Sequence, residues 1–323
     1  MRLLVTGGAG YVGSIVARQL IGAGHDVTVP DDLSRGHRAA VPDGARLVET
    51  SLLDEAGTRA AVAEGFDGVL HFAALALVAE SVAHPERYHR GNIVGALNLL
   101  DAMRDAGVRG LVFSSTCAVY GEPDTVPMTE DIPAAPVNAY GNSKLAIDRM
   151  ITDECRAHGL GAASLRYFNV AGASGPLGED HEPETHLIPL VLRAAAGVSD
   201  HVKVFGTDYP TRDGTAVRDY IHVEDLGRAH ALALAALEPG RHRIYNLGTG
   251  DGYTVKEVVD TARRVTGRAI PAVEEPRRPG DPPALVAASD RIRDELGWVP
   301  EKGLDDMIAD AWAWHQAHPQ GYA

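Results

Sequence analysis

Tyr140 and Lys144 stand four residues apart in the stretch 138–144. If a helix begins there, both side chains lie on one face of it. A phenol has a pKa of about 10, so ionisation near pH 7 requires about 4 kcal/mol. One ammonium at about 5 Å supplies roughly 3 kcal/mol in an effective dielectric of about 20. A second cation, such as an oxidised nicotinamide ring, could supply the remainder. We interpret the pair as an acid/base; the alternative is a surface tyrosine that happens to precede a lysine.

Two further features support chemistry near this pair. Lys144 is the only lysine before Lys203, and arginine supplies nearly all the other positive charge. Because arginine does not lose its proton, a single lysine in this chain suggests a specific role. Thr116 ends an apolar segment, where its hydroxyl could bond a substrate oxygen. The alternative for Thr116 is a strand-end residue satisfied by the backbone.

A glycine-rich turn follows the first apolar segment. Residues 2–6 predict a short buried strand, then come Gly7, Gly10 and Gly13, and then a helix with apolar periodicity over 14–23. This order of strand, turn and helix is the context of a dinucleotide-binding loop. The N-terminus of the helix attracts phosphate charge. We expect a pyrophosphate here; the alternative is a plain glycine-rich turn.

Asp31 stands at the C-terminal end of a second expected strand, 25–29. A carboxylate in this place accepts hydrogen bonds from both ribose hydroxyls. Asp31 and Asp32 would repel a 2′-phosphate, so NAD is favoured over NADP. Arg35 is the one nearby group that argues otherwise. The alternative for Asp31 is a turn aspartate that caps the next segment.

Strand and helix patterns then alternate along the first half of the chain. Further strands are expected at 46–49, 68–74 and 110–116, and a helix is expected at 92–106. This alternation indicates an α/β fold with a doubly wound (Rossmann) parallel sheet. In such sheets ligands lie at the carboxyl ends of the strands, which is where Thr116 is expected.

The length of 323 residues favours a second, smaller α/β lobe. The segment 171–185 has no periodic pattern, and we interpret it as the crossing into that lobe. We place a dinucleotide-binding domain at 1–172 and a substrate domain at 173–323. The two are interleaved, because part of 219–250 returns to the first lobe.

The second half offers fewer residues with clear chemistry. Phe205 ends an expected strand and could face an aromatic base, or it could be a core phenylalanine. Arg218 and Arg278 are candidates for two phosphate charges, since guanidinium groups match them bidentately. The alternative for each is a surface ion pair. Asp281 could accept from ribose hydroxyls or cap a turn.

Composition excludes several classes of protein. The net charge of −14 argues against nucleic acid and anionic membranes as partners. Cys117 and Cys155 have no metal-ligand spacing and suggest no disulfide framework, so we expect no metal and a reducing, cytoplasmic compartment. We find neither a signal-peptide layout nor an apolar run long enough to span a bilayer.

Taken together, the chain resembles the extended short-chain dehydrogenase/reductase superfamily, and more closely its UDP-glucose 4-epimerase family. The resemblance covers nearly the whole length. Beside the glycine loop, 114–116 and the Tyr140/Lys144 pair, it is carried by the stretches 84–86, 119–121, 166–169, 205–211, 213–215, 217–223, 245–250 and 277–281.

The resemblance implies an NAD-dependent isomerase that interconverts UDP-glucose and UDP-galactose through a transient 4-keto sugar, in galactose metabolism. Tyr140 would be the base, Lys144 its partner and a ribose ligand, and Thr116 the hydroxyl that orients the sugar O4. A homodimer through helices near 92–104 and 143–158 is implied as well.

The resemblance also assigns binding residues. Those expected to hold NAD are Gly7, Gly10, Tyr11, Val12, Gly13, Asp31, Asp32, Leu33, Ser51, Leu52, Phe72, Ala73, Ala74, Asn92, Ser114, Lys144 and Phe168. Those expected to hold the UDP-sugar are Thr116, Asn169, His186, Leu187, Lys203, Val204, Phe205, Arg218, Arg278, Asp281 and Leu285.

Four positions set this chain apart from many members of the family. Many relatives carry an aspartate where Ser51 stands and a lysine within 74–77, so the strength of NAD binding is expected to differ. His186 replaces a frequent asparagine. Leu285 is smaller than the tyrosine that some relatives place beside the sugar C2 substituent, so N-acetylated sugars are expected to enter.

Three other activities stay open. One is epimerisation of another UDP-sugar, such as UDP-N-acetylglucosamine or a UDP-pentose. The second is a nucleotide-sugar 4,6-dehydratase or UDP-glucuronate decarboxylase. Those enzymes carry an acidic residue after the position of Thr116, where this chain has Cys117 and Ala118. The third is a non-catalytic NAD sensor, which would have no need of the Tyr140/Lys144 pair.

Overall fold

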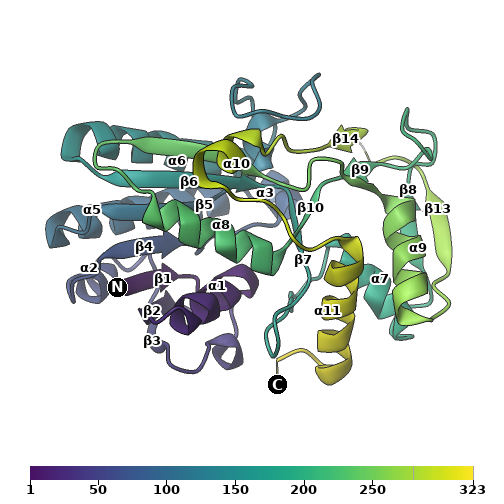
Figure 1. The fold of residues 1–323 in the computed structure, drawn as a ribbon, viewed down its shortest axis with the longest axis horizontal. Coiled ribbons are helices and arrows are strands. Elements are labelled where there is room, and N and C mark those ends of the chain that lie inside the picture. Colours follow the sequence, from purple (N-terminus) through teal and green to yellow (C-terminus); the bar gives the residue numbers. More distant parts are fainter. Residues whose placement is uncertain (279, 323) are drawn as a thin grey trace.

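A seven-stranded parallel sheet is the centre of the computed structural model, which describes residues 1–278 and 280–322 (Figure 1). Pro279, within the stretch 277–281, and Ala323 lie outside the described residues. In spatial order the strands are β11 (His242–Leu247), β6 (Gly161–Tyr167), β5 (Gly110–Thr116), β4 (Gly68–His71), β1 (Arg2–Thr6), β2 (Asp26–Asp31) and β3 (Arg46–Glu49). The predicted doubly wound α/β fold is confirmed.

Successive side chains of the central strands enter two separate cores. On β1, Leu3 and Val5 pack into one apolar cluster, whereas Leu4 packs into another on the opposite face. This is the period-two alternation of a strand buried on both sides. A parallel sheet therefore needs helices on both faces.

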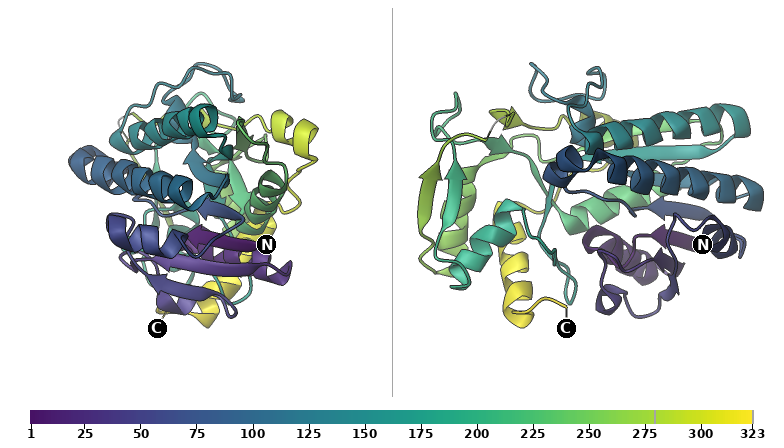
Figure 2. Two further views of the ribbon diagram at one scale, coloured as in Figure 1. Left: turned by 90° about the vertical axis from the view of Figure 1, so that its left-hand side faces the viewer. Right: turned by 180° about the vertical axis from the view of Figure 1, so that it is seen from behind.

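The helices form a layer on each face of the sheet, as the left view of Figure 2 shows. One layer holds α1 (Tyr11–Gly22), α8 (Val223–Ala235) and α10 (Asp290–Leu296). The other holds α2 (Glu55–Val62), α5 (Gly95–Ala106) and α6 (Ala139–His158). Shorter helical segments lie between these elements along the chain: α3 (Val78–Ala83), α4 (Pro85–Tyr88), a π-helix at His89–Val94 and 3₁₀ turns at Arg38–Ala40 and Cys117–Tyr120.

Several element boundaries differ from the predicted ones. Helix α1 begins at Tyr11 rather than Ser14, because the glycine turn passes directly into the helix. Strand β2 runs on to Asp31, and β4 ends at His71, so that the small residues after it form loop. The first turn of the predicted helix 92–106 is π-helical.

A smaller lobe lies beside the carboxyl ends of the sheet (Figures 1 and 2). It contains α7 (Leu187–Ala195), α9 (Val255–Thr266) and α11 (Leu304–Ala317), which share one apolar core. Its strands are short and form three small sheets: β8 (Val202–Phe205) with β13 (Ala272–Glu275), β7 (Asn169–Ala171) with β10 (Tyr220–His222), and β12 (Tyr253–Thr254) with β9 (Val217–Arg218) and β14 (Ala284–Leu285).

The chain crosses between the two lobes more than once. After α7 and β8 it returns to the large sheet with α8 and β11, within the segment 219–250 that the sequence analysis singled out. The domain division at residue 172 stays a proposal. Both cysteines are free thiols. Within 1–278 and 280–322, no helix has the length and apolarity to cross a bilayer.

Candidate functional site

A cavity of about 1100 Å³ opens at the carboxyl ends of the strands and is walled by both lobes. Its volume slightly exceeds the upper end of the usual range for a single ligand, about 300–1,000 Å³. The first lobe contributes the glycine loop, the loop after β4 and the start of α6. The second lobe contributes residues around His186, Arg278 and Leu285.

Helix α6 places Tyr140 and Lys144 in this cavity. The helix begins where Asn138 caps it, its side-chain oxygen accepting the Gly141 N–H at 2.8 Å. Tyr140 lies in the first turn, and Lys144 follows one turn later on the same face. The Lys144 ammonium donates to the Ser114 main-chain oxygen at 2.8 Å and lies 4.8 Å from the centre of the Phe113 ring.

The acidities of this pair differ from the expected ones. Burial raises the pKa of Tyr140 to about 12, and the nearby Thr116 hydroxyl offsets only part of this. Burial lowers the pKa of Lys144 to about 7. The Lys144 nitrogen lies 6.0 Å from the Tyr140 ring centre. The expectation that Lys144 supplies most of the shift is wrong for the chain alone, because burial outweighs the ammonium.

Thr116 occupies the end of β5, as expected. It caps the following 3₁₀ turn, its oxygen accepting the Ala118 N–H at 3.2 Å. The alternative of a backbone-satisfied hydroxyl is thus realised in part. The hydroxyl can still donate, since only its acceptor capacity is used. It lies beside the Tyr140 phenol in the cavity wall.

The glycine loop has the form that a pyrophosphate needs. Gly7 has φ of +72°, which L side chains rarely adopt, and a methyl group on Gly13 would lie 2.3 Å from the Gly7 oxygen. The N-cap of α1 is Gly10, which has no side chain to accept the first-turn N–H groups. These N–H groups are free for an anion at the cavity wall.

Asp31 accepts one N–H on each carboxylate oxygen. Ala9 donates to Oδ2 at 3.0 Å and Leu33 donates to Oδ1 at 2.9 Å. Both oxygens keep a second lone pair for ribose hydroxyls. Burial raises the pKa of Asp31. Leu33 itself has φ of +57° and lies outside the cavity wall, so only its N–H contributes.

Asn92 organises the loop after β4. Its side-chain oxygen accepts the Leu75 N–H at 2.8 Å, and its amide donates to the Leu75 oxygen and to Ser143, each at 3.0 Å. This amide therefore joins the loop to α6, one residue before Lys144. Phe72, Ala73, Ala74 and Phe168 line the cavity nearby, as expected for residues beside a nicotinamide.

Most predicted site residues lie in the cavity wall. On the cofactor side these are Gly7, Gly10, Tyr11, Val12, Gly13, Asp31, Asp32, Ser51, Leu52, Phe72, Ala73, Ala74, Asn92, Lys144 and Phe168. Around the sugar they are Thr116, Tyr140, Asn169, His186, Arg278, Asp281 and Leu285. Their individual roles stay predictions.

Seven predicted residues do not line the cavity: Leu33, Ser114, Leu187, Lys203, Val204, Phe205 and Arg218. Ser114 lies behind Lys144 and hydrogen-bonds Tyr167 through its hydroxyl. Leu187 opens α7 and packs against the core of the smaller lobe.

The strand 202–205 is the clearest departure from prediction. The Lys203 side chain is 55% exposed and pairs with Glu275 at 3.3 Å, and Val204 is buried. The guanidinium of Arg278 lies 3.9 Å from the Phe205 ring centre, so it covers one face of that ring. The role of Phe205 stays a prediction.

The two predicted phosphate ligands, Arg278 and Arg218, lie in different surroundings. Arg278 lines the cavity, whereas Arg218 forms an ion pair with Asp281 and donates to the Val217 oxygen at 2.6 Å. The Arg218 side chain is only 14% exposed in this ion pair, and its role toward a diphosphate stays a prediction.

Sequence reasoning missed several cavity residues. Tyr167 lies within the motif 166–169, and Glu179 and His181 lie in the aperiodic segment 171–185; all three line the cavity without having been predicted to do so. The signal available was the spacing of acids and histidines over 179–186, which a periodicity search for helices and strands does not register.

Comparison with known proteins gives the family. The model of the NAD dependent epimerase/dehydratase family matches residues 3–248. The UDP-glucose 4-epimerase of Corynebacterium glutamicum is 58% identical over 319 residues, covering 98% of this chain and 96% of the relative. The chain belongs to the UDP-glucose 4-epimerase family.

Solved structures agree with this assignment. A crystal structure of a UDP-glucose 4-epimerase superposes with a TM-score of 0.97 at 45% identity, with both chains fully covered. The UDP-glucose 4-epimerase of Bifidobacterium longum, in complex with NAD⁺ and UDP, gives a TM-score of 0.94 at 37% identity over the full length of both chains. The family predicted from the sequence is confirmed, as is an isomerase that depends on NAD.

Proposed function

We propose that this protein interconverts UDP-glucose and UDP-galactose by redox-neutral epimerisation at C4 of the sugar. The observation that carries the proposal is the meeting of Tyr140 and Thr116 with the glycine loop and Asp31 in one cavity. A phenol and a hydroxyl lie at one end, and an anion site and a ribose site lie at the other. The geometry suits a dinucleotide beside a nucleotide sugar.

The chain fits NAD by its own groups. The uncapped N-terminus of α1 offers N–H donors to the pyrophosphate, and Asp31 has lone pairs for the adenosine ribose. NAD bound there supplies an acceptor, and then a donor, for the C4 hydride. Its positive ring would also favour the phenolate of Tyr140, whose pKa the protein raises by burial.

The remaining groups act on the sugar. Tyr140 takes the proton from the sugar O4 as C4 is oxidised and returns it as C4 is reduced. Thr116 donates a hydrogen bond that orients O4. Lys144, held by Ser114, faces the same end of the cavity and is a candidate ligand of the nicotinamide ribose. Arg278 can pair with the diphosphate.

The setting of this activity is part of the proposal. We infer a cytoplasmic enzyme of galactose metabolism that acts as a homodimer through α5 and α6. Light scattering on the purified protein measures the mass; a monomer at micromolar concentration would exclude the dimer.

Product analysis tests the proposed activity. Purified protein is incubated with UDP-galactose without added NAD, and the nucleotide sugars are separated. We expect UDP-glucose at equilibrium with UDP-galactose.

Tyr140→Phe should lower turnover about 10²–10⁴-fold, the usual contribution of a positioned acid/base. Tyr245→Phe is the matched control, since Tyr245 is a buried tyrosine of β11 outside the cavity. A requirement for stoichiometric NAD, or equal turnover in Tyr140→Phe, would contradict the mechanism.

A further inference from the structure

Four side chains converge on one point in the segment that crosses between the lobes. They are Glu179, His181, Glu184 and His186, here called the Glu–His cluster, and one ligand atom from each lies within 4.8 Å of the others. The two carboxylates are almost fully buried, with 6% and 5% of their side-chain surfaces exposed. Buried carboxylates require a nearby cation.

No lysine or arginine supplies this cation within residues 1–278 and 280–322. The ion-pair partners of Glu179 and Glu184 are the imidazoles of His181 and His186. Glu179 raises the pKa of His186, so this imidazole balances one of the two buried carboxylates, and the other has no lysine or arginine partner among the described residues.

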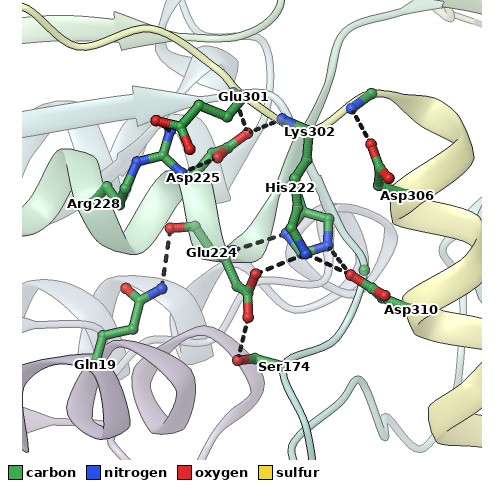
Figure 3. A network of polar contacts seen from close by, with 12 residues as sticks. Gln19, Ser174, His222, Glu224, Asp225, Arg228, Glu301, Lys302, Asp306 and Asp310 are labelled. Carbon is green, nitrogen blue, oxygen red and sulfur yellow. Dashed lines mark hydrogen bonds and ion pairs between the residues drawn. The ribbon is translucent and has the colours of Figure 1, made fainter. Parts of the chain in front are cut away.

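In a second cluster of the same protein, a lysine balances the charge of the carboxylates. His222, Glu224 and Asp310 also come together, but the ammonium of Lys302 lies 2.8 Å from Glu224 and 2.7 Å from Asp310 (Figure 3). That lysine occupies the place in which a metal ion would balance the carboxylates. The Glu–His cluster has no such group among the described residues.

Four nitrogen–oxygen distances in the Glu–His cluster, from 2.7 to 3.9 Å, bracket the separation of two ligands around a tetrahedral ion. Zinc binds imidazole nitrogen and carboxylate oxygen at about 2.0–2.2 Å, so its tetrahedral ligands lie roughly 3.3 Å apart. His186 Nδ1 lies 2.7 Å from Glu179 and 3.2 Å from Glu184. His181 Nδ1 lies 3.2 Å from Glu179 and 3.9 Å from Glu184.

An unsatisfied nitrogen gives independent support. His181 Nδ1 is a buried atom, and it makes no hydrogen bond of acceptable geometry with any described residue despite its approach to Glu179. A buried ring nitrogen without a partner is costly unless it binds something. Directed at a metal ion, its lone pair would be used.

We propose that Glu179, His181, Glu184 and His186 form a tetrahedral zinc site that fixes the crossing segment in the cavity wall. Two imidazoles select a transition metal such as zinc over Mg²⁺ or Ca²⁺, which prefer oxygen ligands. Two carboxylates balance the charge of the ion. The sequence predicts no metal site by its cysteines, since neither Cys117 nor Cys155 has the spacing of a metal ligand.

The position of the site gives it a structural role. His181 meets the ring of Tyr11 edge-on, with the ring centres 6.3 Å apart, and the Tyr11 hydroxyl donates to the Gly172 oxygen at 2.6 Å. His186 is the residue before α7. The ion would therefore connect the start of α1, beside the pyrophosphate site, to the first helix of the smaller lobe.

Metal binding can be measured without reference to catalysis. Protein without a histidine tag is freed of metal by a chelator and titrated with Co²⁺, whose visible absorption reports tetrahedral coordination; Zn²⁺ is then added as competitor. We expect one tetrahedral Co²⁺ per chain, displaced by Zn²⁺ but not by Mg²⁺. Glu179→Gln and His181→Ala should each weaken binding more than about 100-fold, since loss of an outer-shell partner alone costs 10–100-fold.

Matched controls separate the site from general binding. Glu182→Gln alters an exposed acid in the same segment, outside the cluster, and Asp310→Asn alters the second cluster. Both should bind Co²⁺ as the unaltered chain does. If His181→Ala fails to fold by circular dichroism, Glu184→Gln carries the test. Octahedral Co²⁺, equal competition by Mg²⁺, or equal affinity in Glu179→Gln would overturn the proposal and show histidine–carboxylate ion pairing instead.

Discussion

Lys144 on α6 donates to the main-chain oxygen of Ser114 on β5, 2.8 Å away, and both groups are almost completely buried. The bond fixes the ammonium at the carboxyl end of β5 and holds the first turns of α6 against the sheet. The same burial disfavours the charge, and it lowers the pKa of Lys144 to about 7 from an ordinary value near 10.5. The burial that fixes the position of the Lys144 nitrogen thus also destabilises its charged form.

Stability should therefore depend on pH through Lys144. Between about pH 7 and 10.5 the unfolded chain keeps the proton that the folded chain has lost, so the free energy of unfolding rises with pH. Below pH 7, Lys144 is protonated in both the folded and the unfolded chain, and the full cost of burying its charge reduces stability. Relative to Lys144→Met, the unaltered chain should gain up to about 1.4 kcal/mol per pH unit in this window. Urea unfolding at pH 7.5 and 9.5 measures it; a parallel pH dependence of the two proteins would refute a lowered pKa.

The contact between Gly13 and Gly7 predicts a specific loss of NAD. A methyl group on Gly13 would lie 2.3 Å from the Gly7 oxygen, so Gly13→Ala must displace the glycine loop. We expect the NAD content of the purified protein to fall at least about tenfold, which corresponds to 1.4 kcal/mol. Gly22→Ala is the control in the same helix, because nothing lies within 4 Å of its added methyl group. Equal NAD content in the two variants would show that the loop adapts.

The buried ion pair of Asp148 and Arg166 positions α6 from its centre. Arg166 on β6 donates to the Asp148 carboxylate at 2.8 Å and 3.2 Å, and both side chains are at most 5% exposed. Asp148→Asn leaves the guanidinium uncompensated and should cost about 3–5 kcal/mol of unfolding free energy. Asp153→Asn, exposed on the same helix, should change stability by less than about 0.5 kcal/mol.

A paired substitution tests the interpretation. Asp148→Leu combined with Arg166→Met removes both charges, and it should recover much of the stability lost in Asp148→Asn. Turnover is expected to recover less, since α6 would lose the directional contact that orients its first turn. Urea unfolding of the double variant decides: if it is no more stable than Asp148→Asn, packing rather than charge dominates here.

Local pattern was enough to predict the scaffold of the site. The bounds of β5 and the end of α5 before Gly107 agree with prediction, because the apolar period and the terminating glycine are encoded in neighbouring residues. The glycine loop and Asp31 followed from the same kind of signal. These features depend on a few adjacent side chains.

Partner choice could not be predicted in the same way. Arg218 pairs with Asp281, 63 positions away, and Arg278 covers the ring of Phe205. The pKa of Tyr140 depends on how deeply both lobes bury it. Each of these depends on packing between distant segments, about which local pattern carries no information.

Leu285 offers a test of substrate range. It lies on β14, lines the cavity and, like Phe168, packs against a buried cluster that includes Tyr120. The family resemblance places this position beside the sugar C2 substituent. Leucine leaves more room there than tyrosine, so we expect weak turnover of UDP-N-acetylglucosamine. Leu285→Tyr should remove this turnover while UDP-glucose turnover changes less than about tenfold.

Leu285→Val, which enlarges the space, should instead raise the ratio of kcat/KM for the N-acetylated sugar to that for UDP-glucose. Because a hydrophobic pocket distinguishes a small group by only about 1–3 kcal/mol, ratios within about 10–200-fold are expected. No turnover of UDP-N-acetylglucosamine by the unaltered chain or by Leu285→Val, at high enzyme concentration, would show that another residue closes the C2 side of the cavity.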